Sequence, residues 1–376
     1  MITIDKAVQN ESFLLLIATV ALVAVGIVMV YSASGVMAEQ VYKDQNLFLK
    51  RHLVYVLIGL AAMLLTINLD YHAWYAARWP LLVLTFALLL LVLVPGAGRK
   101  VDGARRWIDL GFVTIQPSEI AKFAMLVYLA SLLKRKHAKV DSLKSVFVPA
   151  MVVVGATAAL VLAEHDLGSP AVIVAMFLML LFIAGGRLPH IACFASLCLV
   201  SFATLIAIDA ERRGRMLAFL NPWAHAQDDG FHLVQSFIGF GVGGVFGEGL
   251  GHGRQKLFYL PAAHTDFVFS VVGEELGMVG TCGIVALYVL FLCLGLRVAL
   301  RAKDSFGSFL AAGITLMISF QALMNTAVVT GLVPTKGLTL PFISYGGSSL
   351  IISMMSVGVL INIASKQRIP RARYAR

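Results

Sequence analysis

The chain contains about ten apolar runs, each long enough to cross a lipid bilayer as a helix, and this pattern limits its fold more than any other feature. A spanning helix needs about 20 mostly apolar residues, because its polar backbone groups must be paired internally. The runs predict helices near residues 12–34, 52–69, 79–95, 117–133, 145–163, 169–185, 189–208, 267–296, 307–329 and 342–364. We therefore expect an all-α integral membrane protein with about ten transmembrane helices, and residues 1–376 to form a single polytopic domain.

Composition agrees with a membrane protein and argues against a nucleic-acid partner. Hydrophobic residues make up 59% of the chain and charged residues only 13%, whereas soluble domains carry about 25% charged residues. The formal net charge is +10, but the basic residues lie in short clusters between apolar runs. Such clusters are typical of topology signals, and they indicate membrane lipids or an anionic substrate as partners. The four cysteines lie inside apolar runs without metal-type spacing and are expected to be small core residues.

The basic loops also predict the topology. Lys and Arg are dense in segments 134–144 and 297–303 and in the C-terminal tail. An even number of helices places these segments on the side of the N-terminus, and the positive-inside rule makes that side the cytoplasm. The other side receives loops near 35–51, 96–116, 209–266 and 330–341.

The outer loops contain basic residues as well, against the positive-inside rule. They include Arg99, Lys100, Arg105, Arg106, Arg212, Arg213, Arg215, Arg254, Lys256 and Lys336. Positive charge on the disfavoured side indicates an anionic ligand there.

The outer segment 209–266 is too long for a simple connection, and its many aromatic residues argue against disorder. Its glycine-rich part, 238–253, suits re-entrant or interfacial backbone that is sheltered by protein. Gly239, Gly241 and Gly244 formally match a dinucleotide-binding pattern, but no βαβ unit surrounds them. Close backbone packing is the better interpretation.

His264, Thr265 and Asp266 end this segment, directly before an apolar helix. Thr265 and Asp266 could simply cap that helix. Alternatively, a carboxylate at the membrane boundary, near His264 and Lys256, is suited to act as a general base toward an anionic substrate.

Ionisable residues inside the predicted helices need a partner or a function. Glu119 and Lys122 are three residues apart and can pair on one helix face. Either this pair is structural, or Lys122 is kept in a membrane cavity to bind phosphate. Glu274 and Glu275 lie about two turns into the helix near 267–296.

Two further groups flank these helices. Arg105, Arg106 and Trp107 could anchor the chain at the lipid headgroups or bind an anion. Glu164, His165 and Asp166 could bind a metal, pair with these arginines, or be solvated. We expect the run 334–349, rich in proline, glycine and hydroxyl groups, to be irregular backbone that lines a cavity or is packed in protein, and it includes Ser344, Tyr345 and Ser348.

These motifs, taken together and in this order, closely resemble the SEDS family of bacterial shape, elongation, division and sporulation proteins, which includes FtsW and RodA. The resemblance covers nearly the whole chain. It rests on residues 104–108, 116–119, Lys122, 221–223, 255–256, 264–267, 273–277 and 341–349. Residues 335–341 look like the FtsW branch. Ala262 replaces a glutamate common in the family, and His165 replaces a proline, whereas Asp166 is kept.

The resemblance implies a peptidoglycan glycosyltransferase that polymerises lipid II, the undecaprenyl-pyrophosphate-linked disaccharide-pentapeptide, in septal cell-wall synthesis. Asp266 matches the family's proposed catalytic aspartate. The implied substrate-binding residues are Arg105, Arg106, Trp107, Glu119, Lys122, Asp166, Lys256, His264, Thr265, Ser344, Tyr345 and Ser348. No metal site or cofactor is evident, and a divalent cation bridging the pyrophosphate stays open.

The resemblance also implies a bacterial cytoplasmic membrane location at the division septum, a class B penicillin-binding protein as partner transpeptidase, and other division proteins as partners. Two alternatives remain open: a lipid II flippase and a non-catalytic division scaffold. The paired broken helices of many transporters are not apparent in the sequence. A scaffold would leave the intramembrane charges without a purpose.

Overall fold

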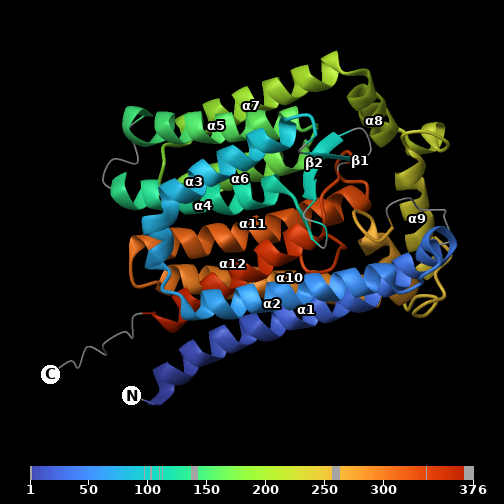
Figure 1. Ribbon diagram of the computed structural model, residues 1–376, viewed down its shortest axis with the longest axis horizontal. Coiled ribbons are helices and arrows are strands. Elements are labelled where there is room, and N and C mark those ends of the chain that lie inside the picture. Colours follow the sequence, from blue (N-terminus) through green and yellow to red (C-terminus); the bar gives the residue numbers. More distant parts are fainter. Residues whose placement is uncertain are drawn as a thin grey trace.

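The computed structural model describes residues 2–96, 98–101, 104–109, 111, 113–136, 143–255, 263–335 and 337–367. Most of them form long helices that run side by side in one bundle (Figure 1). The helices are α1 (Ile2–Tyr42), α2 (Leu47–Asn68), α3 (His72–Leu93), α4 (Pro117–Lys136), α5 (Val148–Ala163), α6 (Gly168–Ile183), α7 (Leu188–Ile208), α8 (Ala210–Leu220), α9 (Phe231–Gly243), α10 (Val268–Arg301), α11 (Ser305–Val329) and α12 (Gly347–Ser365). A π-helical turn, Leu143–Phe147, precedes α5, and a 3₁₀ turn, Pro222–His225, precedes α9.

Each of the ten predicted spans coincides with one long helix, α1 to α7 or α10 to α12. Within the described residues, eight of these are long and apolar enough to cross a membrane. The other two are α4 and α6. Helix α4 carries Glu119, Lys122 and Lys134, and α6 has only 16 residues, which corresponds to about 24 Å of helix. Both pack against other helices of the bundle, so the charges of α4 do not require contact with lipid.

The centre of the bundle is formed by α4, α11 and α12. The apolar windows of α11 and α12 are 72% and 83% buried, whereas that of α7 is 6% buried, so α7 lies at the periphery. Small residues permit the close approach of the central helices. At Gly313, for example, an added Cβ would come within 1.9 Å of the Leu126 side chain.

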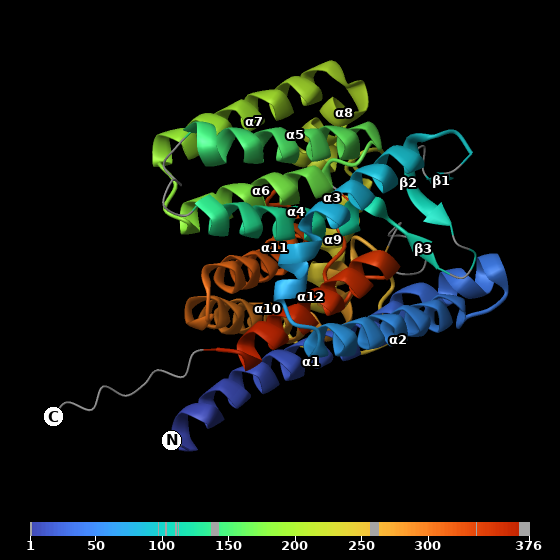
Figure 2. The ribbon, with the colours of Figure 1, turned by 60° about the vertical axis from the view of Figure 1, so that its left-hand side comes forward.

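The two ends of the bundle differ. Both described ends of the chain lie at one end, which we call the proximal end (Figure 1). The opposite, distal end carries α8, α9 and a small sheet (Figure 2). The described segments that were expected on opposite sides of a membrane thus lie at opposite ends of the bundle, and the side that each end faces stays a prediction.

The small sheet was not predicted and lies in the segment between α3 and α4. Its antiparallel strands are β1 (Arg99–Val101), β2 (Ala104–Asp109) and β3 (Thr114–Ile115), in the order β1-β2-β3. The fold is thus nearly but not entirely helical. Strands of two to six residues are too short to produce a readable alternation.

The distal segment 209–255 is largely exposed and is held by local contacts. Asp209 caps α8 by accepting the backbone N–H groups of Glu211 and Arg212 at 3.0 and 3.4 Å. Helix α9 packs tightly on α10, since a Cβ added at Gly243 would come within 2.0 Å of the Gly273 carbonyl oxygen. The shelter expected for residues 238–253 is found only where α9 meets α10, because most side chains of this run are exposed and Phe246 is 83% exposed.

Of the three glycines that suggested close packing, two have a structural reason. A Cβ at Gly239 would lie 3.2 Å from Ser270 Oγ, and Gly244 has a φ of +52°. Gly241 has open space around it. The packing interpretation is confirmed at Gly239, and Gly244 is required by its backbone conformation.

Helix α10, predicted as continuous, is broken at Gly277, where φ is 64° and ψ is −161°. The break is filled by the backbone that follows α9. Met278 and Val279 donate their N–H groups to the carbonyls of Gly244 and Val245 at 2.9 and 3.1 Å. In return, the carbonyls of Glu274 and Glu275 accept N–H groups from residues 248 and 249, both at 3.0 Å. Irregular backbone is tolerated here because its polar groups are paired within the protein.

Candidate active site at the distal end

Residues 337–349, which we call the connector, lead from α11 into the first turn of α12 and organise the candidate site. The connector is largely buried, and Phe342 is 1% exposed at a φ of +71°. Ser344 Oγ accepts the Leu340 N–H at 2.8 Å, and the Tyr345 N–H donates to the His264 carbonyl at 2.9 Å. The irregular backbone expected here is therefore packed in protein, and its turn attaches directly to the segment that carries Asp266.

Asp266 lies in the turn before α10 and is half-buried. Asn325 of α11 fixes its backbone: Asn325 Nδ2 donates to the carbonyl oxygens of Asp266 at 2.8 Å and of Leu338 at 2.5 Å. The Asp266 carboxylate lies beside Gly337, where an added Cβ would be 2.9 Å from Oδ2. The carboxylate is thus held between α10 and the connector.

The electrostatic surroundings of Asp266 favour proton uptake. Burial and the charge of Asp166 raise the pKa of Asp266, the charge of Arg106 lowers it, and together they bring it to about 6. A carboxylate whose pKa lies near the working pH can accept a proton and release it again. This property separates Asp266 from an ordinary helix-capping aspartate.

Arg106 links the β-sheet to the turn after α5. Its Nε and Nη2 donate to the carbonyl oxygens of Glu164 and His165 at 3.2 and 2.5 Å. His165 has a φ of +63°, and its carbonyl is one of the two that Arg106 binds. Of the three alternatives for residues 164–166, the structure shows pairing with an arginine, made through backbone carbonyls rather than carboxylates.

Asp166 stabilises the start of α6. Its Oδ1 accepts the N–H groups of Gly168 and Ser169 at 2.9 and 3.2 Å, and its Oδ2 accepts the Ser169 hydroxyl at 2.6 Å. These bonds fix the carboxylate at the start of α6. In the described part of the chain, no group of three or more His, Cys, Asp or Glu residues is arranged to hold a metal ion.

Glu164 is the unusual member of this group. Its side chain is 1% exposed, and neither carboxyl oxygen has a hydrogen-bond partner among the described residues. Burial raises the pKa of Glu164 to about 8; the charge of Asp166 adds to this effect, and that of Arg106 opposes it. Glu164 is therefore a neutral acid at pH 7, in the same electrostatic environment as Asp266.

Lys122 and Glu119 form a buried ion pair in α4. Lys122 Nζ lies 2.8 Å from a Glu119 carboxylate oxygen and donates to Gln321 Oε1 at 2.6 Å. Gln321 Nε2 in turn donates to the Thr339 carbonyl of the connector at 3.0 Å. Lys122 is 1% exposed. The structure shows the structural pairing, and a substrate phosphate would have to displace one of these partners, so the phosphate role stays a prediction.

His264 and Tyr345 belong to an aromatic cluster with α2. The His264 ring lies 4.8 Å from the Phe48 ring and 5.7 Å from the Tyr345 ring. Burial lowers the pKa of His264 to about 4, so the ring is neutral at pH 7. The cluster supports the connector rather than supplying charge.

Ser348 fastens the connector to the β-sheet. Its hydroxyl donates to the Thr114 carbonyl at 3.0 Å and accepts the Gln116 N–H at 2.9 Å. The hydroxyl groups of Ser348 and Ser344 therefore both bind backbone groups and stabilise the connector.

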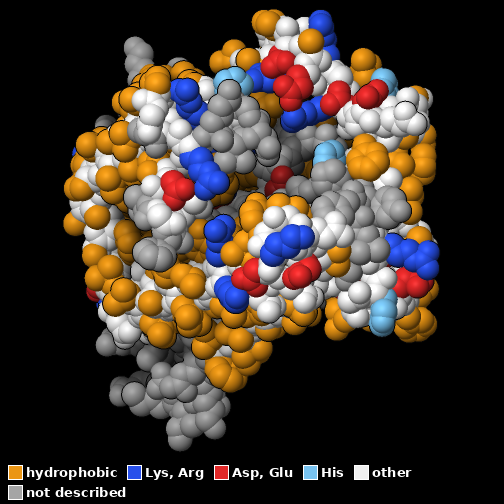
Figure 3. Space-filling view, turned by 45° about the vertical axis from the view of Figure 1, so that its right-hand side comes forward, with side chains coloured by type: hydrophobic (Ala, Val, Ile, Leu, Met, Phe, Trp, Pro, Cys, Tyr) orange, Lys and Arg blue, Asp and Glu red, His pale blue; other side chains and the backbone are white. Residues whose placement is uncertain are grey.

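The remaining predicted residues are spread along the distal end. Arg105 and Trp107 lie in β2 and are half-buried, opposite Lys100 and Arg99 of β1. Thr265 is half-buried beside Asp266. Lys256 lies outside the described residues, as does Lys336. In space-filling form this face is hollowed, and Lys, Arg, Asp and Glu side chains are spread over it (Figure 3).

Sequence reasoning missed Gln321 and Asn325, which are one helical turn apart on α11 and face the connector. They are 4% and 1% exposed. Both are polar residues within an apolar run, so the same signal that singled out Glu119 and Lys122 could have identified them.

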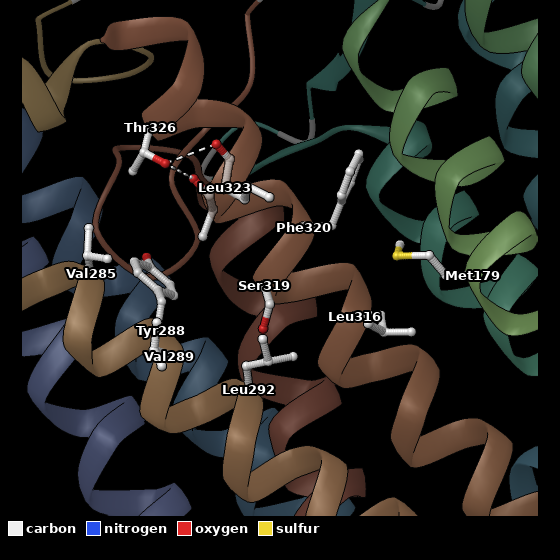
Figure 4. Close-up of a pocket in the computed structure, with 11 residues that line it drawn as sticks. Met179, Val285, Tyr288, Val289, Leu292, Leu316, Ser319, Phe320, Leu323 and Thr326 are labelled. Carbon is white, nitrogen blue, oxygen red and sulfur yellow. Dashed lines mark hydrogen bonds between the residues drawn. The ribbon is translucent and has the colours of Figure 1, made fainter. Parts of the chain in front are cut away.

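An apolar cavity of about 240 Å³ lies between α6, α10 and α11 (Figure 4). Its lining includes Tyr288, Phe320 and Thr326, and Thr326 follows Asn325 directly. The Tyr288 hydroxyl donates to the carbonyl of Pro341 in the connector. The cavity therefore reaches from the membrane-spanning region toward the elements that hold Asp266.

Long apolar helices around a buried polar site at one end define a multi-pass integral membrane protein. The chain belongs to the FtsW, RodA and SpoVE family, described as "Cell cycle protein", whose sequence model matches residues 13–369. The resemblance identified from the motifs is thereby confirmed.

Curated relatives match over nearly their full length. The probable peptidoglycan glycosyltransferase FtsW of Geobacter sp. (strain M18) is 46% identical over 363 residues, which cover 96% of this chain and 99% of that protein. Stage V sporulation protein E of Bacillus subtilis (strain 168) is 43% identical over 359 residues, with 96% and 98% coverage. The FtsW names agree with the branch indicated by residues 335–341.

Solved structures of similar fold include the rod shape determining protein RodA of Thermus thermophilus, with 28% identity, a TM-score of 0.70 and coverage of 94% of this chain and 96% of that one. A chain from a peptidoglycan synthase complex that coordinates polymerization and crosslinking has 29% identity and a TM-score of 0.75, with 93% and 96% coverage. Both support the arrangement of helices described above.

Proposed function

We propose that this chain is a peptidoglycan glycosyltransferase that polymerises lipid II into glycan strands, with Asp266 as the general base. The observation that carries the proposal is the state of Asp266: half-buried, fixed through its backbone by Asn325, with a pKa raised to about 6. The names of the relatives support the reaction class. Such a carboxylate is ionised at neutral pH yet basic enough to accept a proton.

The reaction needs one proton acceptor and one site for the leaving group. Asp266 takes the proton from the attacking sugar hydroxyl while the hydroxyl oxygen forms a bond to the anomeric carbon of the second sugar. The bond from that carbon to the pyrophosphate breaks, and the electron pair leaves with the pyrophosphate, so the configuration inverts. Arg105 and Arg106 supply positive charge near the leaving group. The substrate's polyprenyl chain would lie along the apolar cavity between α10 and α11. This position is consistent with a reacting end of the substrate near Asp266.

The setting of the reaction is proposed on the sequence and the relatives together. The basic loops put both termini in the cytoplasm and the distal end on the outer face of the bacterial cytoplasmic membrane. The FtsW relatives favour the division septum. A class B penicillin-binding protein and other division proteins are the proposed partners, and the similar synthase complex supports the first of these. No resident cofactor is proposed, and any divalent cation would arrive with the substrate's pyrophosphate.

Asp266→Asn tests the proposal. The substitution leaves the backbone carbonyl that binds Asn325 in place, so folding and insertion should be preserved. Loss of a general base lowers the rate roughly 10²–10⁴-fold. Purified protein is supplied with lipid II, with and without its partner transpeptidase, and the glycan polymer is measured.

The matched control is Asp209→Asn, which changes a distal carboxylate that caps α8 and pairs with Arg212 in the same helix. Polymer formation by this variant should stay close to that of the unmodified chain. A folded Asp266→Asn protein that polymerises lipid II at an undiminished rate would refute the mechanism. An assay of lipid II translocation in the same preparation then distinguishes the two alternatives. A flippase would move lipid II across the membrane, and a scaffold would not.

A further inference from the structure

A second cavity, of about 410 Å³, lies at the proximal end, between α3, α4 and the start of α5. Helix α3 begins and α4 ends at this end of the bundle, opposite the sheet and α9 (Figures 1 and 2). The cavity is therefore separate from the Asp266 site. Its walls include Arg78, Trp79, Tyr128, Ser131, Arg135 and Ser145. We call it the proximal pocket.

The proximal pocket contains two guanidinium groups and no carboxylate among its lining residues. Arg78 comes from α3 and Arg135 from α4, and neither forms an ion pair with any described residue. The nearby Lys134 differs, because its ammonium group is 3.3 Å from Asp304. Two cations that face one cavity without a counter-ion among the described residues repel each other, and an anion between them removes that repulsion.

Arg78 is also held in position. Its Nη1 donates to the Tyr75 carbonyl at 2.5 Å, and the guanidinium carbon lies 4.4 Å from the centroid of the Tyr75 ring. This arrangement fixes the guanidinium plane and leaves its other N–H groups for a ligand. Fixed guanidinium N–H groups are well suited to phosphate oxygens.

The surroundings of the pocket are those of a lipid headgroup region. Trp79 is 49% exposed, and its ring lies 5.8 Å from that of Tyr128, an aromatic pair of the kind found where a helix meets the headgroups. One turn further along α3 and α5, Val83 and Val152 are 67% and 60% exposed. A charged pocket thus opens beside an apolar surface that suits acyl chains.

We propose that the proximal pocket binds the phosphate headgroup of an anionic glycerophospholipid from the leaflet on the side of the termini. Arg78 and Arg135 bind the phosphodiester, the Ser131 and Ser145 side chains line the space beside it, and the acyl chains lie against Val83 and Val152. Basic loops attract anionic membranes without any such pocket. Binding at the pocket should depend on Arg78 and Arg135 in particular, whereas diffuse attraction should depend on the total charge.

The test uses the full-length protein, purified and delipidated, with phosphatidylglycerol as probe and native mass spectrometry as readout. The double substitution Arg78→Gln and Arg135→Gln removes two charges from the pocket. The control, Arg297→Gln with Lys303→Gln, removes two charges from exposed positions at the same end. We expect phosphatidylglycerol affinity to fall about tenfold or more in the pocket variant and only a few-fold in the control.

Equal losses in the two variants would overturn the proposal in favour of diffuse surface attraction. Inorganic phosphate distinguishes a lipid site from a free-phosphate site: we expect it neither to bind measurably alone nor to displace the lipid, and displacement at equal concentration would overturn the lipid assignment. Should the double variant unfold, Arg135→Gln alone is informative, because Arg135 is exposed at the end of α4. Unchanged phosphatidylglycerol binding in that variant would also contradict the proposal.

Discussion

The buried pair of Glu119 and Lys122 permits a prediction that separates stability from catalysis. Lys122→Met removes the cation, so the Glu119 carboxylate, 6% exposed, loses its counter-charge, and Gln321 Oε1 loses its donor. Breaking a buried pair by removing one partner costs about 3–5 kcal/mol. The orphaned amide oxygen adds about 1–3 kcal/mol. We therefore expect Lys122→Met to be strongly destabilised.

The double substitution Glu119→Gln with Lys122→Met should recover most of this loss, because no charge then remains buried. Thermal or denaturant unfolding of the purified variants in one detergent gives the double-mutant cycle. We expect a coupling energy above about 1 kcal/mol, as for residues in one buried network.

Polymerisation by the double variant then decides the function of Lys122. If the pair is structural, the double variant makes glycan once it is folded. A stable double variant without polymer formation would refute the purely structural interpretation and support the phosphate role predicted from the sequence. Unfolding of Lys122→Met at the same point as the unmodified protein would show that the pair does not stabilise the bundle.

Three further predictions concern the distal site. Because Asp266 must be ionised to act as a base and its pKa is about 6, kcat/KM should fall about tenfold per pH unit below pH 6; a flat profile from pH 5 to 8 would contradict this. The Glu164 pKa is raised to about 8, so burial favours the protonated form and the protein loses stability as pH rises toward 8. The stability of Glu164→Gln, measured against that of the unmodified protein, should thus increase from pH 5 to pH 8. A difference between their unfolding midpoints that stays constant with pH would disprove this. Gly337→Ala should displace the Asp266 carboxylate and lower kcat about tenfold or more, since the added Cβ lies 2.9 Å from Oδ2, whereas Gly241→Ala, with open space, should not; equal activities would refute this.

The part of the fold that could be predicted is the set of long helices, because it depends on the length of the apolar runs. Ten apolar runs became ten long helices, because in hydrocarbon a helix is the only single-segment structure that pairs all its backbone groups. The break at Gly277 could not be predicted, since an isolated glycine within an apolar run is common and its effect here depends on backbone from residues 244–249. Likewise, the strand 104–109 reads in the sequence as a charged loop.

The site could be located but not assembled from the sequence. Asp266 and Lys122 stood out because charges near or within spans are costly. Their partners could not be named in the same way: Arg106 binds two backbone carbonyls, which carry no sequence signal. The absence of hydrogen-bond partners for Glu164 among the described residues is a property of tertiary packing.

The interruption of α10 has a mechanical consequence for the base at its start. Residues on both sides of Gly277 are hydrogen-bonded to the chain that follows α9, so this chain bridges the two parts of α10. The half-helix that follows Asp266 is therefore tied to α9 as well as to the rest of its own helix. A load applied to α9 by a bound protein would reach the start of α10 through these four hydrogen bonds.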